Sequence, residues 1–301
     1  MISICIPIYN FDVTELVREL HTQGETFGIP FQILLMDDAS RGEFRAKNEH
    51  LSKLTNVDYI QLNDNLGRTG IRNLLADKSL YRYLLFIDCD SKVVRNDYLS
   101  LYLPFCRAGI ICSGGRAYLD APSDEQFCLH WRVGVAKEVV SAEQRSIQPN
   151  KSFMSCNFLI DKDIFHTVKF DERLKGYCNE DTLFGIELDR NGIVIQHINN
   201  PLYHIGLESA ADFLAKIENG MRNLHKIDRM LESDPLFVKS VTIMRCYHRL
   251  KKLRLPPLIS IAFQITRYSI RKNLLGKNPS LKLYDLYKLG YLCHARNWPN
   301  D

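Results

Sequence analysis

Short apolar runs alternate with stretches of helical periodicity along the first hundred residues. The runs have the length of buried strands and are rich in branched and aromatic residues: Ile2–Ile8, Phe31–Met36, Val57–Leu62 and Tyr83–Ile87. Amphipathic stretches such as Val13–Thr22 and Thr69–Lys78 separate them. This alternation predicts an α/β fold with a mainly parallel sheet whose two faces are covered.

Polar residues follow three of these predicted strands at the point where each strand ends. They are Tyr9-Asn10, Asp37-Asp38 and Asp88-Cys89-Asp90. In an open α/β sheet, ligands bind in the crevice beyond the carboxyl ends of the strands. The pattern therefore predicts a polar binding site at this edge of the sheet.

The last third of the chain is predicted to be helical. Residues 211–231 carry apolar side chains at helical spacing, which indicates core packing, and Pro256-Pro257 precedes further basic helical sequence. We expect one large domain over residues 1–205. A helical, basic C-terminal region is expected over 206–301.

Composition agrees with a globular protein, since 46% of the 301 residues are apolar and 25% are charged. The chain opens directly on a strand pattern, so we expect no signal peptide. Its nine cysteines show no CxxC spacing, which argues against a disulfide framework or a zinc site and favours a reducing cytoplasm.

The net charge of +4 hides an uneven distribution. Between Val238 and Tyr284 there are eleven basic and no acidic residues, so the rest of the chain carries −7. This segment also has an amphipathic stretch, 256–275, that could lie on an anionic membrane surface. The alternative is a helical appendage with a solvated basic face. No recognition motif supports a nucleic-acid partner.

Several short motifs could carry chemistry, each with a structural alternative. The carboxylates of Asp88 and Asp90 could hold Mg²⁺ or Mn²⁺ against phosphate oxygens, although turns are also rich in Asp. Asp37-Asp38 could bind a ribose or base, or could cap a helix. Arg68 and Arg72, in the glycine-containing segment 65–73, could pair with a diphosphate.

Two later features, taken alone, are more often structural than functional. Glu180-Asp181 stands before a predicted helix over Thr182–Asn191, where acidic residues commonly complement the helix dipole. His204 could ligate a metal ion through its neutral imidazole or could be structural.

Together these residues resemble the pattern of glycosyltransferase family 2. The matching segments, in order, are Ser3-Ile4-Cys5-Ile6-Pro7-Ile8-Tyr9-Asn10, Asp37-Asp38-Ala39-Ser40, Asn65 to Asn73, Asp88-Cys89-Asp90, Phe170-Asp171-Glu172 and Glu180-Asp181. The resemblance covers roughly residues 1–205. It implies that they form a catalytic domain, with a nucleotide-sugar half at about 1–110 and an acceptor half at about 111–205. It implies a GT-A fold, a Rossmann-like, mainly parallel sheet flanked by helices, here with a helical C-terminal extension.

The resemblance also implies roles for individual residues. Asp181 would be the general base and Glu180 its acceptor-orienting neighbour. Asp90 would bind Mn²⁺ or Mg²⁺ with Asp88 and His204. The donor would lie against Pro7, Tyr9, Asn10, Asp37, Asp38, Asn65, Arg68, Arg72 and Asp88.

The activity so implied is transfer of a sugar from a nucleotide-diphosphate sugar, with UDP-sugar favoured, onto an acceptor hydroxyl with inversion. The acceptor would be a glycan or a lipid-linked molecule, which the basic C-terminal region could reach at a membrane surface. The Gln-x-x-Arg-Trp motif of processive members is missing, so we expect addition of single sugars, in surface polysaccharide synthesis. Two rival functions are a catalytically dead sugar-nucleotide-binding protein and a haloacid dehalogenase-type phosphatase. The second is disfavoured because Lys92 stands where that family has Thr or Val.

Overall fold

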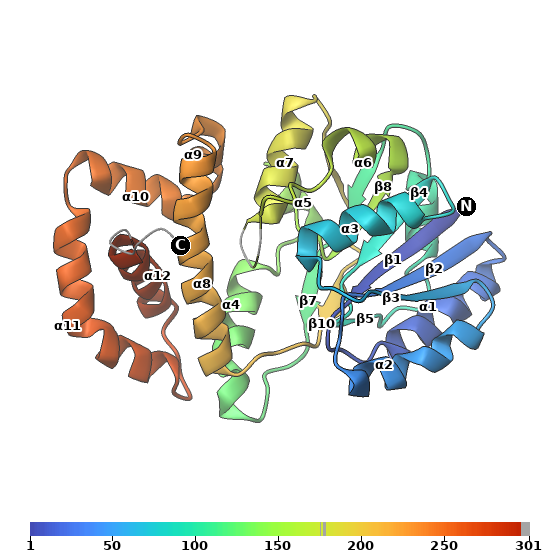
Figure 1. The fold of residues 1–301 in the computed structure, drawn as a ribbon, viewed down its shortest axis with the longest axis horizontal. Helices are drawn as coiled ribbons and strands as arrows, with labels where there is room; N and C mark the ends of the chain where they lie inside the picture. The colour runs from blue at the N-terminus through green and yellow to red at the C-terminus, as the bar shows by residue number, and fades with distance from the viewer. Residues whose placement is uncertain (175, 177–178, 296–301) are drawn as a thin grey trace. The chain divides into compact units, whose positions relative to one another are not determined.

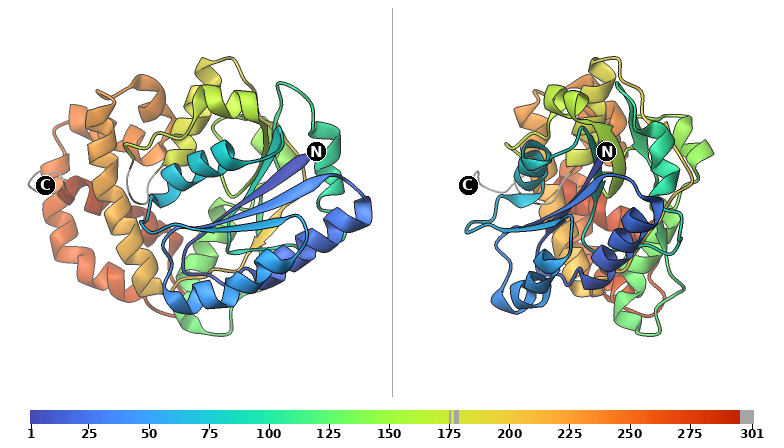
Figure 2. Two further views of the ribbon diagram at one scale, coloured as in Figure 1. Left: turned by 45° about the vertical axis from the view of Figure 1, so that its right-hand side comes forward. Right: turned by 90° about the vertical axis from the view of Figure 1, so that its right-hand side faces the viewer.

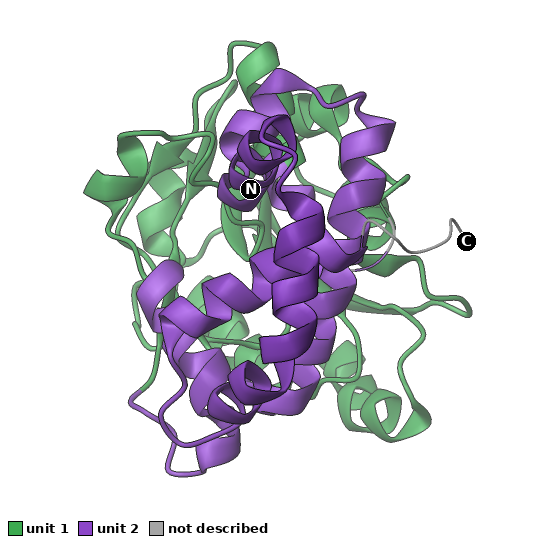
Figure 3. Cartoon of the chain, turned by 90° about the vertical axis from the view of Figure 1, so that its left-hand side faces the viewer, with its two compact units in different colours: residues 1–119, 139–175, 183–206 green, residues 120–138, 176–182, 207–301 purple. Residues whose placement is uncertain are grey.

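The computed structural model describes residues 1–174, 176 and 179–295, which form two compact units (Figure 3). The first unit comprises residues 1–119, 139–175 and 183–206. The second comprises residues 120–138, 176–182 and 207–301. No helix in the described part of the chain combines the length and the apolar character needed to span a bilayer.

The first unit is built on a seven-stranded sheet in the order β3-β2-β1-β4-β8-β6-β9. Figures 1 and 2 show β1, β2 and β3 side by side, with α3 (Gly67–Lys78) lying along the sheet. Its strands are β1 (Ile2–Ile8), β2 (Phe31–Asp37), β3 (Val57–Gln61), β4 (Tyr83–Ile87), β6 (Ile111–Ser113), β8 (Asn157–Asp161) and β9 (Gln196–His197). Strands β1 to β4 are parallel, while β8 runs antiparallel to both β4 and β6. The mainly parallel α/β sheet predicted from the apolar runs is thus confirmed.

The two faces of this sheet bury two separate apolar clusters. Side chains of β1 alternate between them, so that Ile4 and Ile6 enter one cluster and Cys5 enters the other. Helix α1 (Thr14–Phe27) covers the first face, and α3 (Gly67–Lys78) and α6 (Lys162–Val168) cover the second. The prediction that helices cover both faces is confirmed.

Short elements complete the first unit. They are α2 (Gly42–Asn48), α5 (Ala142–Ser146) and the 3₁₀ helices η1 (Glu49–Lys53) and η2 (Ser100–Phe105). A second sheet, in the order β5-β10-β7, joins β5 (Ser91–Lys92), β10 (Leu202–His204) and β7 (Arg116–Tyr118). Helix α7 (Glu180–Arg190) begins in residues of the second unit and continues in the first.

The second unit is helical, as predicted for the C-terminal region. It contains η3 (Glu125–Phe127), α4 (Cys128–Lys137), α8 (Ala210–Met230), α9 (Pro235–Ser240), α10 (Thr242–Lys252), α11 (Pro256–Leu274) and α12 (Leu281–Ala295). Helix α12 packs against α8, α10 and α11. Pro256 and Pro257 occupy the start of α11, where a helix needs no N–H donor, so they begin a helix and do not interrupt one.

Candidate active site

The strand order reverses between β1 and β4, the position at which open α/β sheets bind their ligands. The chain runs from β1 outward to β2 and β3 and then returns to β4 on the other side of β1, so the order reverses at this point. Strand β1 pairs with β4 only from Ile2 to Cys5, so Pro7 lies beyond the last pair. Tyr9, directly after β1, is exposed. Predicted donor residues on β1 and the predicted metal-binding segment after β4 therefore flank the same switch point.

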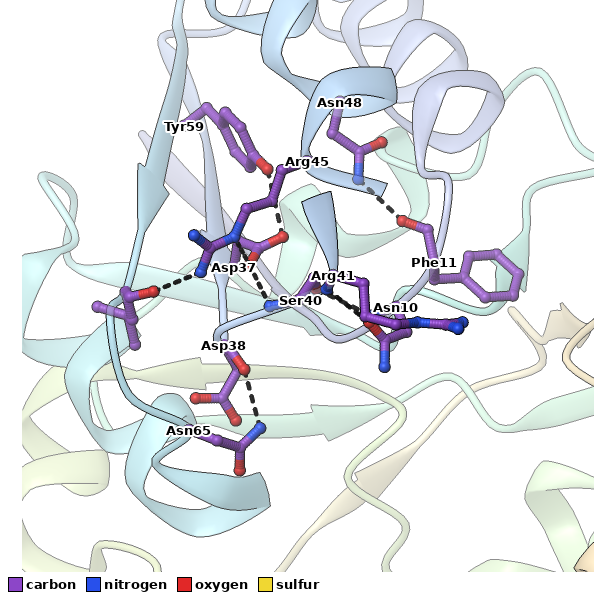
Figure 4. Close-up of polar contacts among 11 residues, drawn as sticks. Asn10, Phe11, Asp37, Asp38, Ser40, Arg41, Arg45, Asn48, Tyr59 and Asn65 are labelled. Atoms are coloured by element: carbon purple, nitrogen blue, oxygen red, sulfur yellow. Dashed lines mark hydrogen bonds and ion pairs between the residues drawn. The ribbon is translucent and has the colours of Figure 1, made fainter. Parts of the chain in front are cut away.

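At the end of β2, Asp37 is an internal carboxylate with several partners (Figure 4). It accepts hydrogen bonds from the Ser40 N–H (2.8 Å), the Arg45 Nε (3.3 Å) and the Tyr59 hydroxyl (3.2 Å). Since this side chain has no exposed surface, its contacts fix the turn after β2. Contact between Asp37 and a donor stays a prediction.

Asp38 joins the end of β2 to the start of α3. Its carboxylate accepts hydrogen bonds from the N–H groups of Leu66 (2.6 Å) and Gly67 (3.0 Å), and its carbonyl accepts one from Asn65 Nδ2 (2.8 Å). Burial raises the pKa of Asp38, and the two N–H donors only partly offset this effect. Asp38 therefore caps a helix, although this is α3 and not the helix that follows it in sequence. Binding of uracil or ribose by Asp38 stays a prediction.

Asn10 ties the ends of β1 and β2 together (Figure 4). Its N–H donates to Ser40 Oγ (2.8 Å), and its Oδ1 accepts from the Arg41 N–H (2.9 Å). Its φ of 51° lies in the left-handed region, which Asn tolerates better than most residues. The family motif residue therefore has a visible role in shaping this edge of the sheet.

Asp88 is held by two arginines from different elements. Arg72 of α3 donates to Oδ1 (2.5 Å), and Arg116 of β7 donates to Oδ2 (3.2 Å). The Arg72 guanidinium is buried and also lies 5.8 Å from the centre of the Phe170 ring. Arg72 was predicted to face a diphosphate, and the structure gives it a carboxylate partner. Any contact between Arg72 and a donor stays a prediction.

Asn73, the last residue of the motif segment 65–73, links this segment to the Phe-Asp-Glu segment 170–172. Asn73 accepts a hydrogen bond from the Phe170 N–H (3.0 Å) and donates to the Phe170 carbonyl (2.9 Å) and to Glu172 (2.8 Å). These bonds hold α3 against the Phe-Asp-Glu segment. This positioning role was not assigned from the sequence.

The small sheet brings His204 to Asp90. Strand β5 follows Asp90 directly and pairs with β10 so that Ser91 lies opposite His204. His204 Nδ1 then lies 3.4 Å from Asp90 Oδ1. Burial disfavours the charge on Asp90, but the contact with His204 and the charges of Arg116 and Arg68 outweigh it and lower its pKa.

The surroundings of Asp90 fit a divalent cation. Oδ1 of Asp90 is buried and accepts no hydrogen bond from the described residues. Gly206 packs against this carboxylate, and a Cβ built there would lie 2.7 Å from the Cβ of Asp90, so no side chain fits without displacing it. No cluster of three or more acidic, His or Cys side chains suited to a metal occurs among the described residues. A metal ion here would therefore need further ligands from a substrate or water.

The predicted base and its neighbour stand at the beginning of α7. Glu180 and Asp181 lie in its first turn, in the part of the helix that belongs to the second unit. Glu180 is buried and Asp181 is partly buried. The helix begins two residues earlier than the predicted Thr182, so both acids lie inside it. Their catalytic roles stay predictions.

Arg116 contacts Asp88 but was not among the predicted donor-binding or metal-binding residues. It follows Gly114-Gly115, and Gly115 adopts a φ of +90° that favours glycine. The Arg145 guanidinium lies 2.7 Å from where a Cβ of Gly115 would be. The Gly-Gly-Arg sequence is typical of a tight turn, but it gives no indication that Arg116 faces Asp88.

Solved structures identify the architecture as the GT-A fold of glycosyltransferases. TarS 1–349 from S. aureus is 18% identical, with 98% of this chain and 89% of that chain covered and a TM-score of 0.52. Mannosyltransferase PcManGT from Pyrobaculum calidifontis, solved with GDP-Man and Mn²⁺, is 9% identical, with 98% and 85% covered and a TM-score of 0.55. Glucosyl-3-phosphoglycerate synthase from Mycobacterium tuberculosis, solved with Mn²⁺, UDP and glucosyl-3-phosphoglycerate, is 14% identical, with 74% and 78% covered and a TM-score of 0.51.

The family follows from the sequence itself. Residues 3–168, more than half of the chain, match the profile of glycosyl transferase family 2. The chain belongs to glycosyltransferase family 2, as the ordered motifs indicated. Comparison with curated proteins gives no match. The phosphatase alternative finds no support, because the segment that suggested it lies inside the glycosyltransferase match.

Proposed function

We propose that the protein transfers a single sugar from a UDP-sugar to an acceptor hydroxyl with inversion at the anomeric carbon. The observation that carries the proposal is the approach of His204 to Asp90, 3.4 Å between Nδ1 and Oδ1, in the segment that follows β4 at the switch point of the sheet. Family 2 membership supports the reaction class.

The charges around this point suit a nucleotide diphosphate. Arg72 and Arg116 contact Asp88, and the charge of Arg68 acts on Asp90, so more cationic than anionic side chains meet there. Fixed positive charge stabilises the negative charge that develops on a leaving diphosphate. UDP is favoured because TarS 1–349 was solved with UDP-GlcNAc and glucosyl-3-phosphoglycerate synthase with UDP, although PcManGT holds GDP-Man.

Asp90 and His204 are the residues that would hold Mn²⁺ or Mg²⁺, with Asp88 beside them. Bound there, the cation would supply charge neutralisation for the diphosphate. Arg72 and Arg116 orient Asp88 through its two carboxylate oxygens. Pro7, Tyr9 and Asn10 would line the donor side of the crevice.

Asp181 would accept the proton of the acceptor hydroxyl as that oxygen forms the new bond to the sugar. An aspartate of ordinary basicity can do this because the hydroxyl becomes strongly acidic only as the bond forms. Glu180 would orient the acceptor. Each reaction would add one hexose to the acceptor. We infer that the enzyme acts in the cytoplasm, in the synthesis of a surface polysaccharide.

Isothermal titration calorimetry tests the donor site. The protein is titrated with UDP, GDP and dTDP, each in Mn²⁺ and then in EDTA, and Asp90→Asn is measured in parallel. We expect UDP to bind in Mn²⁺ and to lose affinity in EDTA and in the variant. If no nucleotide binds under any condition, the proposed donor site is wrong. UDP binding in the absence of any transferase activity would instead favour the catalytically dead alternative.

A further inference from the structure

Helix α11 has an inner face that is fully packed. Ser260, Phe263 and Leu274 are buried, and the Phe263 ring meets the ring of Tyr287 edge to face at 5.3 Å. Gly290 of α12 lies so close to Phe263 that its missing side chain is needed for the contact. This face accounts for the attachment of α11 to its own unit.

The outer face of α11 is also apolar, and it is exposed. Leu258, Ile261, Ile265 and Tyr268 are 57–78% exposed. Their spacing of three, four and three residues places them within about 80° of one another around the helix, roughly opposite Phe263. An amphipathic helix of a soluble domain normally presents polar residues on this side. We therefore expect a binding partner to cover this exposed apolar row.

Basic side chains stand at both ends of this row. Lys251, Lys252 and Arg254 are exposed just before α11, next to the exposed Leu253, and Lys272 continues the row itself. Among the described residues, none of these four forms an ion pair. Two other basic residues nearby do form ion pairs. Arg271 pairs with Glu218 (3.0 Å) and Lys277 pairs with Glu125 (3.0 Å).

We propose that the outer face of α11 binds an anionic lipid membrane, with the helix lying in the plane of the interface. Leu258, Ile261 and Ile265 enter the acyl boundary, and Tyr268 lies at the headgroup level, where aromatic rings are favoured. Lys251, Lys252, Arg254 and Lys272 face anionic headgroups. Membrane binding by this face would not require a bound sugar donor.

The charge of the surface decides against a second copy of the chain. A symmetric interface brings the same patch of both copies together. Here it would oppose unpaired basic residues to one another, with no acidic residue between Val238 and Tyr284 to neutralise them. An anionic membrane buries the apolar row at its acyl boundary and places anionic headgroups opposite the basic residues.

Vesicle flotation with the full-length protein tests the proposal. We expect binding to vesicles of phosphatidylglycerol in phosphatidylcholine, little binding to phosphatidylcholine alone, and loss of binding at high salt. Ile265→Glu should lower the partition coefficient about tenfold or more, because it places a charge in the acyl boundary. Lys272→Ala should lower it about fivefold.

Matched controls separate this surface from general effects. Ile147 of the first unit is as exposed as Ile265, at 77%, so Ile147→Glu makes the same chemical change elsewhere. Lys151→Ala does the same for Lys272, since Lys151 is also exposed. Absence of wild-type binding to anionic vesicles at low salt overturns the proposal, as does equal binding by Ile265→Glu. A dimer in analytical ultracentrifugation that Ile265→Glu dissociates, without vesicle binding, would assign the face to a second copy.

Discussion

Asp88 shows how one side chain of the site is positioned from two directions. Arg72 reaches it from a helix and Arg116 from a strand, and each occupies a different carboxylate oxygen. The family resemblance predicted that Arg72 belongs to the site, but it could not tell where the guanidinium points. That direction depends on Phe170 and Asp88, which lie far from Arg72 in the sequence.

Arg72→Lys should weaken metal-dependent UDP binding about tenfold. A lysine offers one compact ammonium group in place of the planar guanidinium, so it cannot keep both the Asp88 bond and the contact with the Phe170 ring. Calorimetry in Mn²⁺ measures the change. Arg41→Lys is the control, because that side chain is exposed and pairs with the exposed Glu43. Unchanged UDP affinity in Arg72→Lys would show that Asp88 does not need this arginine.

Asp181→Asn should abolish sugar transfer while leaving UDP affinity nearly unchanged. The amide cannot accept a proton, and loss of a general base typically costs about 10²–10⁴-fold in rate. Release of UDP in the presence of acceptor measures transfer, and calorimetry measures binding. Asp189→Asn, near the other end of α7 and exposed, is the matched control. Wild-type turnover in Asp181→Asn would remove this residue from the mechanism.

At the scale of elements, the long strands and helices were predictable and the short strands were not. β1, β2 and β4 are continuous apolar runs, whereas β5, β7 and β10 have only two or three residues, too few for any periodicity. Those short strands nevertheless bring Asp90, Arg116 and His204 together. The His204 assignment therefore depended on resemblance, and the Arg116 contact could not be predicted.

A buried arginine supports the turn that precedes β7. Arg145 of α5 donates to the carbonyls of Val140 (3.1 Å), Ser113 (3.2 Å), Gly114 (3.1 Å) and Ile198 (2.8 Å). It also contacts His197 at 2.9 Å. One side chain thus satisfies carbonyls from several segments around the turn that carries Arg116.

Arg145→Lys should lower the free energy of unfolding by about 2–3 kcal/mol. The shorter, compact ammonium group leaves some of these buried carbonyls without a donor, and each such loss costs about 1–3 kcal/mol. Urea denaturation followed by circular dichroism measures the change. Arg18→Lys, on the exposed surface of α1, should shift it by less than about 0.5 kcal/mol. Equal stability of the two variants would show that the network contributes little.

At the scale of the whole molecule, long-range packing decides how the chain divides. Helix α4 lies in the middle of the sequence, yet it packs against α8 and η3 in the second unit. Periodicity within a segment gives no information about such a partner. The pattern predicted which segments are helical, and the composition predicted a basic C-terminal region, but neither could show that residues 120–138 belong with it.

Stability against acid should depend on Asp161, at the end of β8. This carboxylate is 1% exposed and accepts bonds from Arg82 (3.0 and 2.9 Å) and from the Gly109 N–H (2.8 Å). Burial acts to raise its pKa, but these bonds and the Arg82 charge outweigh it and lower the pKa below the ordinary 3.8. The bound, ionised form therefore stabilises the folded state above about pH 4, and this contribution is lost as the pH falls through the folded-state pKa.

Asp161→Asn should therefore cost about 1–3 kcal/mol at neutral pH and progressively less below about pH 4, because the wild type loses the same charge there. The free energy of unfolding measured against pH gives both curves. Asp97 accepts a similar pair of bonds from Arg95 (2.8 and 2.9 Å) but is 51% exposed, so solvent screens it and Asp97→Asn should leave the curve nearly unchanged. A constant difference between wild type and Asp161→Asn down to pH 2 would mean that the packing of Asp161, and not its charge, stabilises the fold.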